Sequence, residues 1–259
     1  MNIESGYKPN AIEMRSSEEK QLYRGVWADK LEDNQQLPVG GSLFSDKLTH
    51  KLELDFHNFD PELQNFTYEN IQLHWEKDRE NVTNWLQSIN AKIDPLTFYK
   101  MYQVKAKTEA LLKVDPSVTE EDPDRAKTLY SGGAKLSDLV GKSACAERAA
   151  LGQYLLQKIG VETSYVSGAT MNSPDGEGMV NHAFIVVPES DSTFIFDIAR
   201  PKTFNSQMPR IMATEKPYDY NLINGKDNLF VPANDVLDGK TLYFGVGDSN
   251  IDEEPVILQ

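Results

Sequence analysis

Residues 144–160 read ACAERAALGQYLLQKIG and form the most clearly patterned stretch of the chain. Residues 144–159 are good helix formers, and Gly160 is the residue type that most often follows a helix C-terminus. Ser143, just before the run, is the predicted N-cap. One face of the helix is small or apolar and is expected to be buried; it carries Cys145, Ala149, Gly152, Leu156 and Ile159.

Strands dominate the sequence that follows this helix. Apolar or alternating runs bounded by turn residues predict strands at 161–169, 182–187, 193–199 and 241–246. The preceding half is mainly helical: an apolar period near 3.6 predicts a helix at 67–90, Pro95 starts another, and a short one leads towards Tyr130. A short strand is predicted within 51–56. Helices followed by strands favour an α+β fold.

Three segments are predicted along the chain. Residues 1–20 are polar and are expected to be a disordered tail. Residues 21–130 form a mainly helical N-terminal part, and residues 131–259 form a core in which the cysteine-bearing helix packs on an antiparallel sheet. The run Gly-Asp-Ser at 247–249 lacks a following helix signal and is interpreted as a turn after a strand.

Composition restricts the functional classes. The chain has 259 residues, of which 39% are hydrophobic, a share that is ordinary for a globular protein. Its net charge of −14 argues against a nucleic-acid-binding surface, which needs positive charge. No apolar run is long enough to span a bilayer, so no membrane insertion is expected. The N-terminus lacks a signal peptide, which predicts a cytoplasmic protein or one delivered into another cell by a dedicated secretion system.

The single cysteine, Cys145, has two interpretations. It cannot form an intrachain disulfide, and most such residues are small buried hydrophobes. With Ser143 as N-cap, however, Cys145 lies in the first helical turn, where free backbone N–H groups carry partial positive charge. They would stabilise a thiolate and could hold the oxyanion that forms when the thiolate attacks a carbonyl.

A histidine and an aspartate complete a predicted catalytic set with this thiol. Among four histidines, His182 opens an apolar strand, whereas His50, His57 and His74 lie in polar or amphipathic surroundings. Asp197 lies in the next apolar strand, where a carboxylate needs a partner. Antiparallel pairing of the two strands would place Asp197 beside His182, orienting the imidazole as a general acid and base for Cys145. Taken singly, each residue also has a structural explanation, including an Asp197–Arg200 pair.

The segment from Gly141 to Pro201 resembles the core of the transglutaminase-like superfamily, which belongs to the papain-like cysteine fold. The resemblance rests on Cys145 at a helix start, the run IGVETSYVSGA, HAFIVV and FIFDIARP, with Phe184 where the family often has Trp. It implies amide chemistry through a thioester: protease, glutamine deamidase or transglutaminase, acting on a peptide or protein substrate. Oligomeric state stays open.

Two further cleft residues are predicted, and no cofactor or metal is expected. Gln103 is a candidate oxyanion-stabilising side chain by analogy with papain-like sites, and Asn181 adjoins the base. Glu147, one turn from the thiol, lines the cleft or is structural. The acidic runs 120–122 and 252–254 lack the pattern of an EF-hand and are interpreted as solvated turns.

A non-catalytic binding or scaffold protein on the same fold is the alternative. In that case the helical N-terminal half would be the functional surface, with Trp27, Trp75 and Trp85 as anchors for a partner. If the protein is an enzyme, the N-terminal part is expected to select the substrate.

Overall fold

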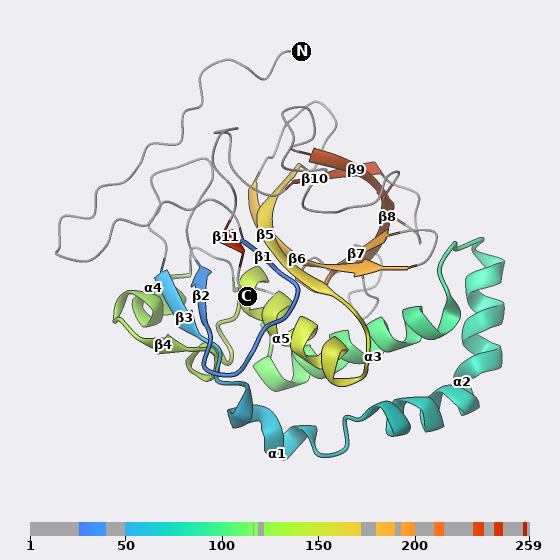
Figure 1. The fold of residues 1–259 in the computed structure, drawn as a ribbon, viewed down its shortest axis with the longest axis horizontal. Coiled ribbons are helices and arrows are strands. Elements are labelled where there is room, and N and C mark those ends of the chain that lie inside the picture. The colour runs from blue at the N-terminus through green and yellow to red at the C-terminus, as the bar shows by residue number, and fades with distance from the viewer. Residues whose placement is uncertain are drawn as a thin grey trace, which may run out of the picture.

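The computed structural model describes residues 26–39, 50–115, 117–118, 122–171, 180–189, 193–199, 210–214, 230–235, 241–245 and 256–257. These residues form a mixed α+β structure, which confirms the predicted class at that level. A curved antiparallel sheet lies on one side and the long helices lie on the other (Figure 1). The predicted tail 1–20, the Gly-Asp-Ser turn, the acidic run 252–254 and Arg200 lie outside the described residues.

Consecutive antiparallel strands build the sheet. They are β5 (Ser164–Met171), β6 (Val180–Pro188), β7 (Thr193–Asp197), β8 (Arg210–Thr214), β9 (Phe230–Asp235) and β10 (Thr241–Gly245). Each pairs with the next, and β10 returns to pair with β5, so the sheet closes into a barrel (Figure 1). The strands predicted from hydrophobic patterning are present, and their closure is an additional feature.

β5 is shared between the barrel and a short extension. Its first half pairs with β1 (Val26–Ala28) and its second half with β10, along the same edge. β11 (Val256–Ile257) runs parallel to β1 on the far side. Chain segments close to both termini therefore meet at this one strand.

The helices form a layer beneath the barrel. They are η1 (Phe56–Phe59), α1 (Asp60–Leu63), α2 (Tyr68–Ser88), α3 (Pro95–Leu112), α4 (Pro123–Tyr130), η2 (Leu136–Leu139) and α5 (Cys145–Lys158). Side chains cap three of them: Thr67 for α2, Asp94 for α3 and Asp122 for α4. Asp122, part of a predicted solvated acidic turn, thus has a structural role.

A small second sheet crosses the boundary predicted between residues 130 and 131. β2 (Gln36–Val39) pairs antiparallel with β3 (His50–Glu53), and β3 pairs parallel with β4 (Ala134–Lys135). The strand predicted in 51–56 is therefore present but ends at Glu53. A continuous hydrophobic cluster also joins Val104 of α3 to Leu155 of α5 and Ile185 of β6. The two predicted parts share their core.

α5 lies at the centre of this core, between β6 and α3 (Figure 1). Its predicted small face is buried, and Gly152 allows the close approach to the barrel. A β-carbon built at Gly152 would lie 2.1 Å from the Cδ1 atom of Ile198 and 3.1 Å from that of Ile185. Gly160, with φ of 74°, ends the helix in the predicted way, with bonds from Gly160 N to Gln157 O and from Val161 N to Leu156 O.

Candidate functional site

Cys145 is the first residue of α5, and its side chain is 8% exposed. The N-cap is Ala144, with no side-chain cap, so the prediction of Ser143 as N-cap is wrong by one residue. The hydroxyl of Ser143 accepts a hydrogen bond from Arg148 Nε at 3.4 Å. Unlike α2, α3 and α4, α5 therefore begins without a capping side chain over its first-turn N–H groups.

His182 and Asp197 lie together on adjacent strands. The β6–β7 ladder pairs Ile185 with Phe196, and this register brings His182 and Asp197 near one another at one end of the ladder. His182 Nε2 is 2.7 Å from Asp197 Oδ2, with the side chains 5% and 0% exposed. The second oxygen, Asp197 Oδ1, accepts a bond from Ala199 N at 3.1 Å. The predicted proximity is present, and because the bond uses Nε2, Nδ1 is the nitrogen available for proton transfer.

The thiol and the His182–Asp197 pair belong to the same buried region. α5 packs directly on β6, the strand that carries His182. Arg148, one turn after Cys145, is 7% exposed and connects the two sets electrostatically. Burial lowers the pKa of Arg148, while the negative charges of Cys145, Glu147, Glu109 and Asp197 act in the opposite direction. Arg148 is therefore within electrostatic range of both the thiol and the aspartate.

A buried ion pair supports the beginning of α5. Arg125 on α4 donates from Nη2 to Glu147 Oε1 at 2.7 Å and from Nε to Oε2 at 3.3 Å. Glu147 Oε2 also accepts a bond from Ala144 N at 2.6 Å. Glu147, which the sequence left open between a cleft and a structural role, is 0% exposed and fixes the backbone one residue before the thiol.

Sequence reasoning missed the contributions of Arg125 and Arg148. Their signal was weak: Glu147 and Arg148 are consecutive charged residues in the first turn of a helix otherwise rich in alanine and leucine. Such residues are rarely buried without a partner. That rule calls for a partner for Glu147 without identifying Arg125 as that partner.

The two predicted cleft residues receive no support as oxyanion donors. Gln103 is partly buried on α3, and its side chain hydrogen-bonds the hydroxyl of Tyr99. Tyr99 in turn donates to Asp78 Oδ2 on α2 at 2.8 Å, and burial first, then Asp78, raises the pKa of Tyr99 to about 12. Gln103 thus belongs to the α2–α3 interface. Asn181 lies in β6 opposite Ala169, and its side chain is outside the described part.

The remaining histidines lie elsewhere. His57 contacts Asp33 Oδ2 through Nδ1 at 2.8 Å on an exposed surface, and His74 is exposed. His50 is half-buried, with its ring 4.4 Å from that of Tyr130 between centroids. None of the three adjoins the start of α5 in sequence or by a described contact.

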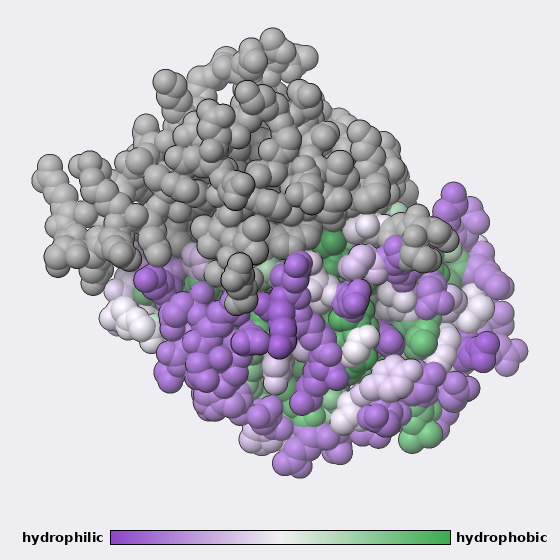
Figure 2. Space-filling model, in the orientation of Figure 1, coloured by the Kyte–Doolittle hydropathy of each residue, from purple (hydrophilic) through white to green (hydrophobic). Residues whose placement is uncertain are grey.

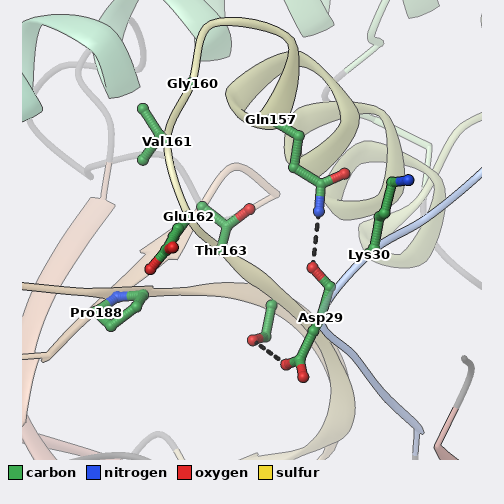
Figure 3. A pocket seen from close by; sticks show the side chains of 9 residues that line it. Asp29, Lys30, Gln157, Gly160, Val161, Glu162, Thr163 and Pro188 are labelled. Carbon is green, nitrogen blue, oxygen red and sulfur yellow. Dashed lines mark hydrogen bonds between the residues drawn. The ribbon is translucent and has the colours of Figure 1, made fainter.

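A pocket of about 600 Å³ lies at the opposite end of α5 (Figure 3). Gln157, Gly160 and Val161 line it from the helix C-terminus, with Asp29 and Pro188 from neighbouring segments. Two hydrogen bonds join polar groups of its lining: Gln157 Nε2 donates to Asp29 O at 2.8 Å, and Ser164 Oγ donates to Asp29 Oδ1 at 2.7 Å. This pocket is separate from the thiol region.

Comparison of the chain with protein-family models, curated proteins and solved structures finds no match. The interpretation of the site therefore depends on its own geometry. Within the part of the chain that the structure describes, no helix is long and apolar enough to cross a membrane.

Proposed function

We propose that the protein is a cysteine-dependent acyl-transfer enzyme that acts on amide carbonyls of a peptide or protein substrate. Cys145 is the nucleophile, His182 the general acid and base, and Asp197 the residue that orients the imidazole. The observation that carries the proposal is the buried 2.7 Å contact between His182 Nε2 and Asp197 Oδ2, on the strand packed against the cysteine-bearing helix. Two buried titratable groups in direct contact, on strands of a sheet that packs against a thiol-bearing helix, are consistent with such a site.

The proposed reaction has two halves. Cys145 transfers its proton to His182 Nδ1, and the sulfur attacks the amide carbon, producing a tetrahedral oxyanion. The carbon–nitrogen bond breaks as His182 protonates the leaving amine, which leaves a thioester on Cys145. In the second half, His182 removes a proton from water or from an acceptor amine, which attacks the thioester. The products are an acid or a new amide, together with the regenerated thiol.

The uncapped start of α5 supports the stabilisation of the oxyanion. The first-turn N–H groups of a helix have no intrahelical acceptor and carry partial positive charge. In α2, α3 and α4 a side chain covers this position, whereas α5 begins at Ala144 with none. The Glu147 carboxylate accepts a hydrogen bond from the N–H of Ala144. The N–H groups that follow in the first turn are the proposed donors to the oxyanion.

Features of the helical half weaken the alternative of a binding or scaffold protein. Trp75 is 5% exposed and packs 5.4 Å from the ring of Tyr99, and Trp85 packs 5.5 Å from Phe98, between centroids. Both rings serve the α2–α3 interface rather than an exposed surface. The side chain of Trp27 lies outside the described part. Figure 2 shows a mainly hydrophilic face over the described helices, with apolar residues scattered across it.

Thiol alkylation tests the proposal directly. The rate of carboxamidomethylation of Cys145 by iodoacetamide is measured against pH in the wild type, His182→Ala and Asp197→Asn, with His74→Ala as control for an exposed histidine. We expect fast labelling that slows in the two site variants and is unchanged in the control. A wild-type rate no faster than that of glutathione, unaffected by His182→Ala, would reject the enzyme in favour of the scaffold.

The reaction type is decided by incubating wild type and Cys145→Ala with a peptide library, with and without a primary amine. Mass spectrometry separates the outcomes: cleavage indicates a protease, replacement of a glutamine amide by an acid indicates a deamidase, and amine addition indicates a transglutaminase. The resemblance to the transglutaminase-like superfamily supports all three. If the peptides show no mass change that depends on Cys145, the proposal is contradicted.

A further inference from the structure

Arg148 is a buried cation next to the proposed nucleophile. It follows Cys145 by one helical turn, and residues three apart on a helix are neighbours on its surface. Its side chain is 7% exposed, in a region where a charge needs compensation. A positive charge buried at this position destabilises the fold unless hydrogen bonds or an opposite charge compensate it.

The described hydrogen bonds of Arg148 all reach neutral acceptors. Nη2 donates to Ser143 O at 2.7 Å and to Asp115 O at 3.5 Å, and Nε donates to Ser143 Oγ at 3.4 Å. The shortest of these bonds, to Ser143 O, holds the backbone two residues before the thiol. In contrast to Arg125, Arg148 has no carboxylate within ion-pair distance among the described residues.

The carboxylates around Arg148 are held by other groups. Glu147 is paired with Arg125, Glu109 with Lys105, and Asp197 with His182. The exposed carboxylate of Asp115, which also interacts electrostatically with Arg148, accepts a hydrogen bond from Ser117. The guanidinium is thus surrounded by acids at longer range but bonded to none of them. A buried anion that can compensate its charge forms one turn away, on the sulfur of Cys145.

We propose that Arg148 is a positioning residue that supplies a permanent positive charge for the Cys145 thiolate and holds the segment from which the thiol projects. This inference rests on the proposed function. Arginine stays protonated at every pH at which an enzyme works, so its charge does not depend on the state of His182. The permanent charge would favour transfer of the thiol proton to His182 and stabilise the thiolate that remains on Cys145.

Charged and titratable groups approach this region from each element packed on the start of α5. They are Glu109 and Lys105 on α3, Asp115 in the segment after α3, Arg125 on α4, Glu147 on α5, His182 on β6 and Asp197 on β7. Because each of these carboxylates already has a hydrogen-bond or ion-pair partner, we expect it to affect the ionisation of the thiol less than Arg148 does. Arg148 is the group whose loss should change the thiol most.

The experiment measures the midpoint of the pH dependence of Cys145 alkylation in Arg148→Gln, Arg148→Lys and His182→Ala. In Arg148→Gln we expect the midpoint to rise by about one to three units. Lysine keeps the charge without the fork, so Arg148→Lys should recover most of this shift. Arg79→Gln, which removes an exposed arginine from α2, is the matched control and should leave the midpoint unchanged.

The variant His182→Ala keeps Arg148 and tests the inference even if Arg148→Gln fails to fold. We expect its thiol midpoint to remain below that of an ordinary cysteine, about 8.5. A midpoint at or above that value, or a folded Arg148→Gln protein with the wild-type midpoint, would overturn the role of Arg148. If alkylation depends on Arg148 but amide turnover is absent, the proposed function fails and this inference survives in its electrostatic part.

Discussion

Two buried charged pairs flank the start of α5, and they differ in what their partners can still do. Arg125 and Glu147 join by two hydrogen bonds, and Glu147 spends a further bond on the backbone of Ala144. His182 and Asp197 join through one ring nitrogen, which leaves the other available. The first pair joins a guanidinium to a carboxylate, and the second contains an imidazole, whose two ring nitrogens allow it both to accept and to donate a proton.

This difference distinguishes a pair that stabilises the structure from a pair that can also take part in proton transfer. Both pairs are buried to a similar degree, so burial alone does not mark a catalytic group. A pair whose polar atoms are all used holds the backbone in place. A pair that keeps one proton-accepting atom in reserve can act on a third group. Mutations in the two pairs should therefore fail in different assays.

Asp197→Asn should give the largest effect, a fall in kcat of about 10³–10⁴-fold. The amide nitrogen would donate to Nε2 and force the ring proton onto Nδ1, the atom that must accept the proton from Cys145. Shape is retained, so the denaturant midpoint should change little. Steady-state kinetics on the best substrate from the peptide screen, beside urea unfolding, measure both. Unchanged kcat would contradict the assignment of Asp197.

Arg125→Met should act in the opposite way, lowering the free energy of unfolding by about 3–5 kcal/mol because Glu147 is left buried without its cation. Urea unfolding measures the loss. The double variant Arg125→Met/Glu147→Met should recover most of it, less about 1–2 kcal/mol for the uncapped N–H of Ala144. A single variant as stable as the wild type would show that the pair is not structural.

Gly152→Val should cost about 1–3 kcal/mol of stability, because the added atoms meet Ile198 and Ile185 where α5 approaches the barrel. Gly152→Ala should be close to neutral, since the flexible ends of both isoleucines can move and alanine favours the helix by about 1 kcal/mol. Thermal unfolding of the two variants gives the comparison. Equal stability for both would contradict the close packing between helix and barrel.

The smallest effect is a pH dependence near the first pair. Burial, and then the charge of Arg125, lowers the pKa of His50 from its ordinary value of 6.5. The unfolded chain therefore takes up this proton first as pH falls, so stability that is complete above pH 6.5 is lost below it. His50→Phe should flatten the decline between pH 7 and 5, measured by urea unfolding at each pH. A decline as steep as in the wild type would contradict this.

The sequence predicted the main helices and the strands β5, β6, β7 and β10 because their signals are local, whereas β1, β2, β8 and β9 were not predicted. The apolar periods at 67–90 and 144–159, Pro95 and Gly160 each act within a few residues, and the structure has helices at those places. The strands carrying His182 and Asp197 were also recognisable, and their adjacency followed from the short turn between them.

The features that were missed depend on distant partners. Burial of Glu147 and Arg148 depends on a salt bridge and on carbonyl groups that local patterning cannot assign. The Ser143 hydroxyl accepts a hydrogen bond from Arg148 instead of capping α5. Gln103 lies beside Tyr99 on the same helix, α3, and the Tyr99 hydroxyl in turn reaches Asp78 of α2. Barrel closure between β5 and β10 likewise joins strands that are far apart in sequence.

The sharing of β5 has a consequence for biosynthesis. A chain leaving the ribosome presents β5, then β6 and β7, well before β10 emerges to occupy the remaining edge of β5. Contacts between segments so distant along the chain form slowly. We therefore expect the nascent polypeptide to carry the formed helix α5 beside an open barrel wall, which closes only once β10 has been translated.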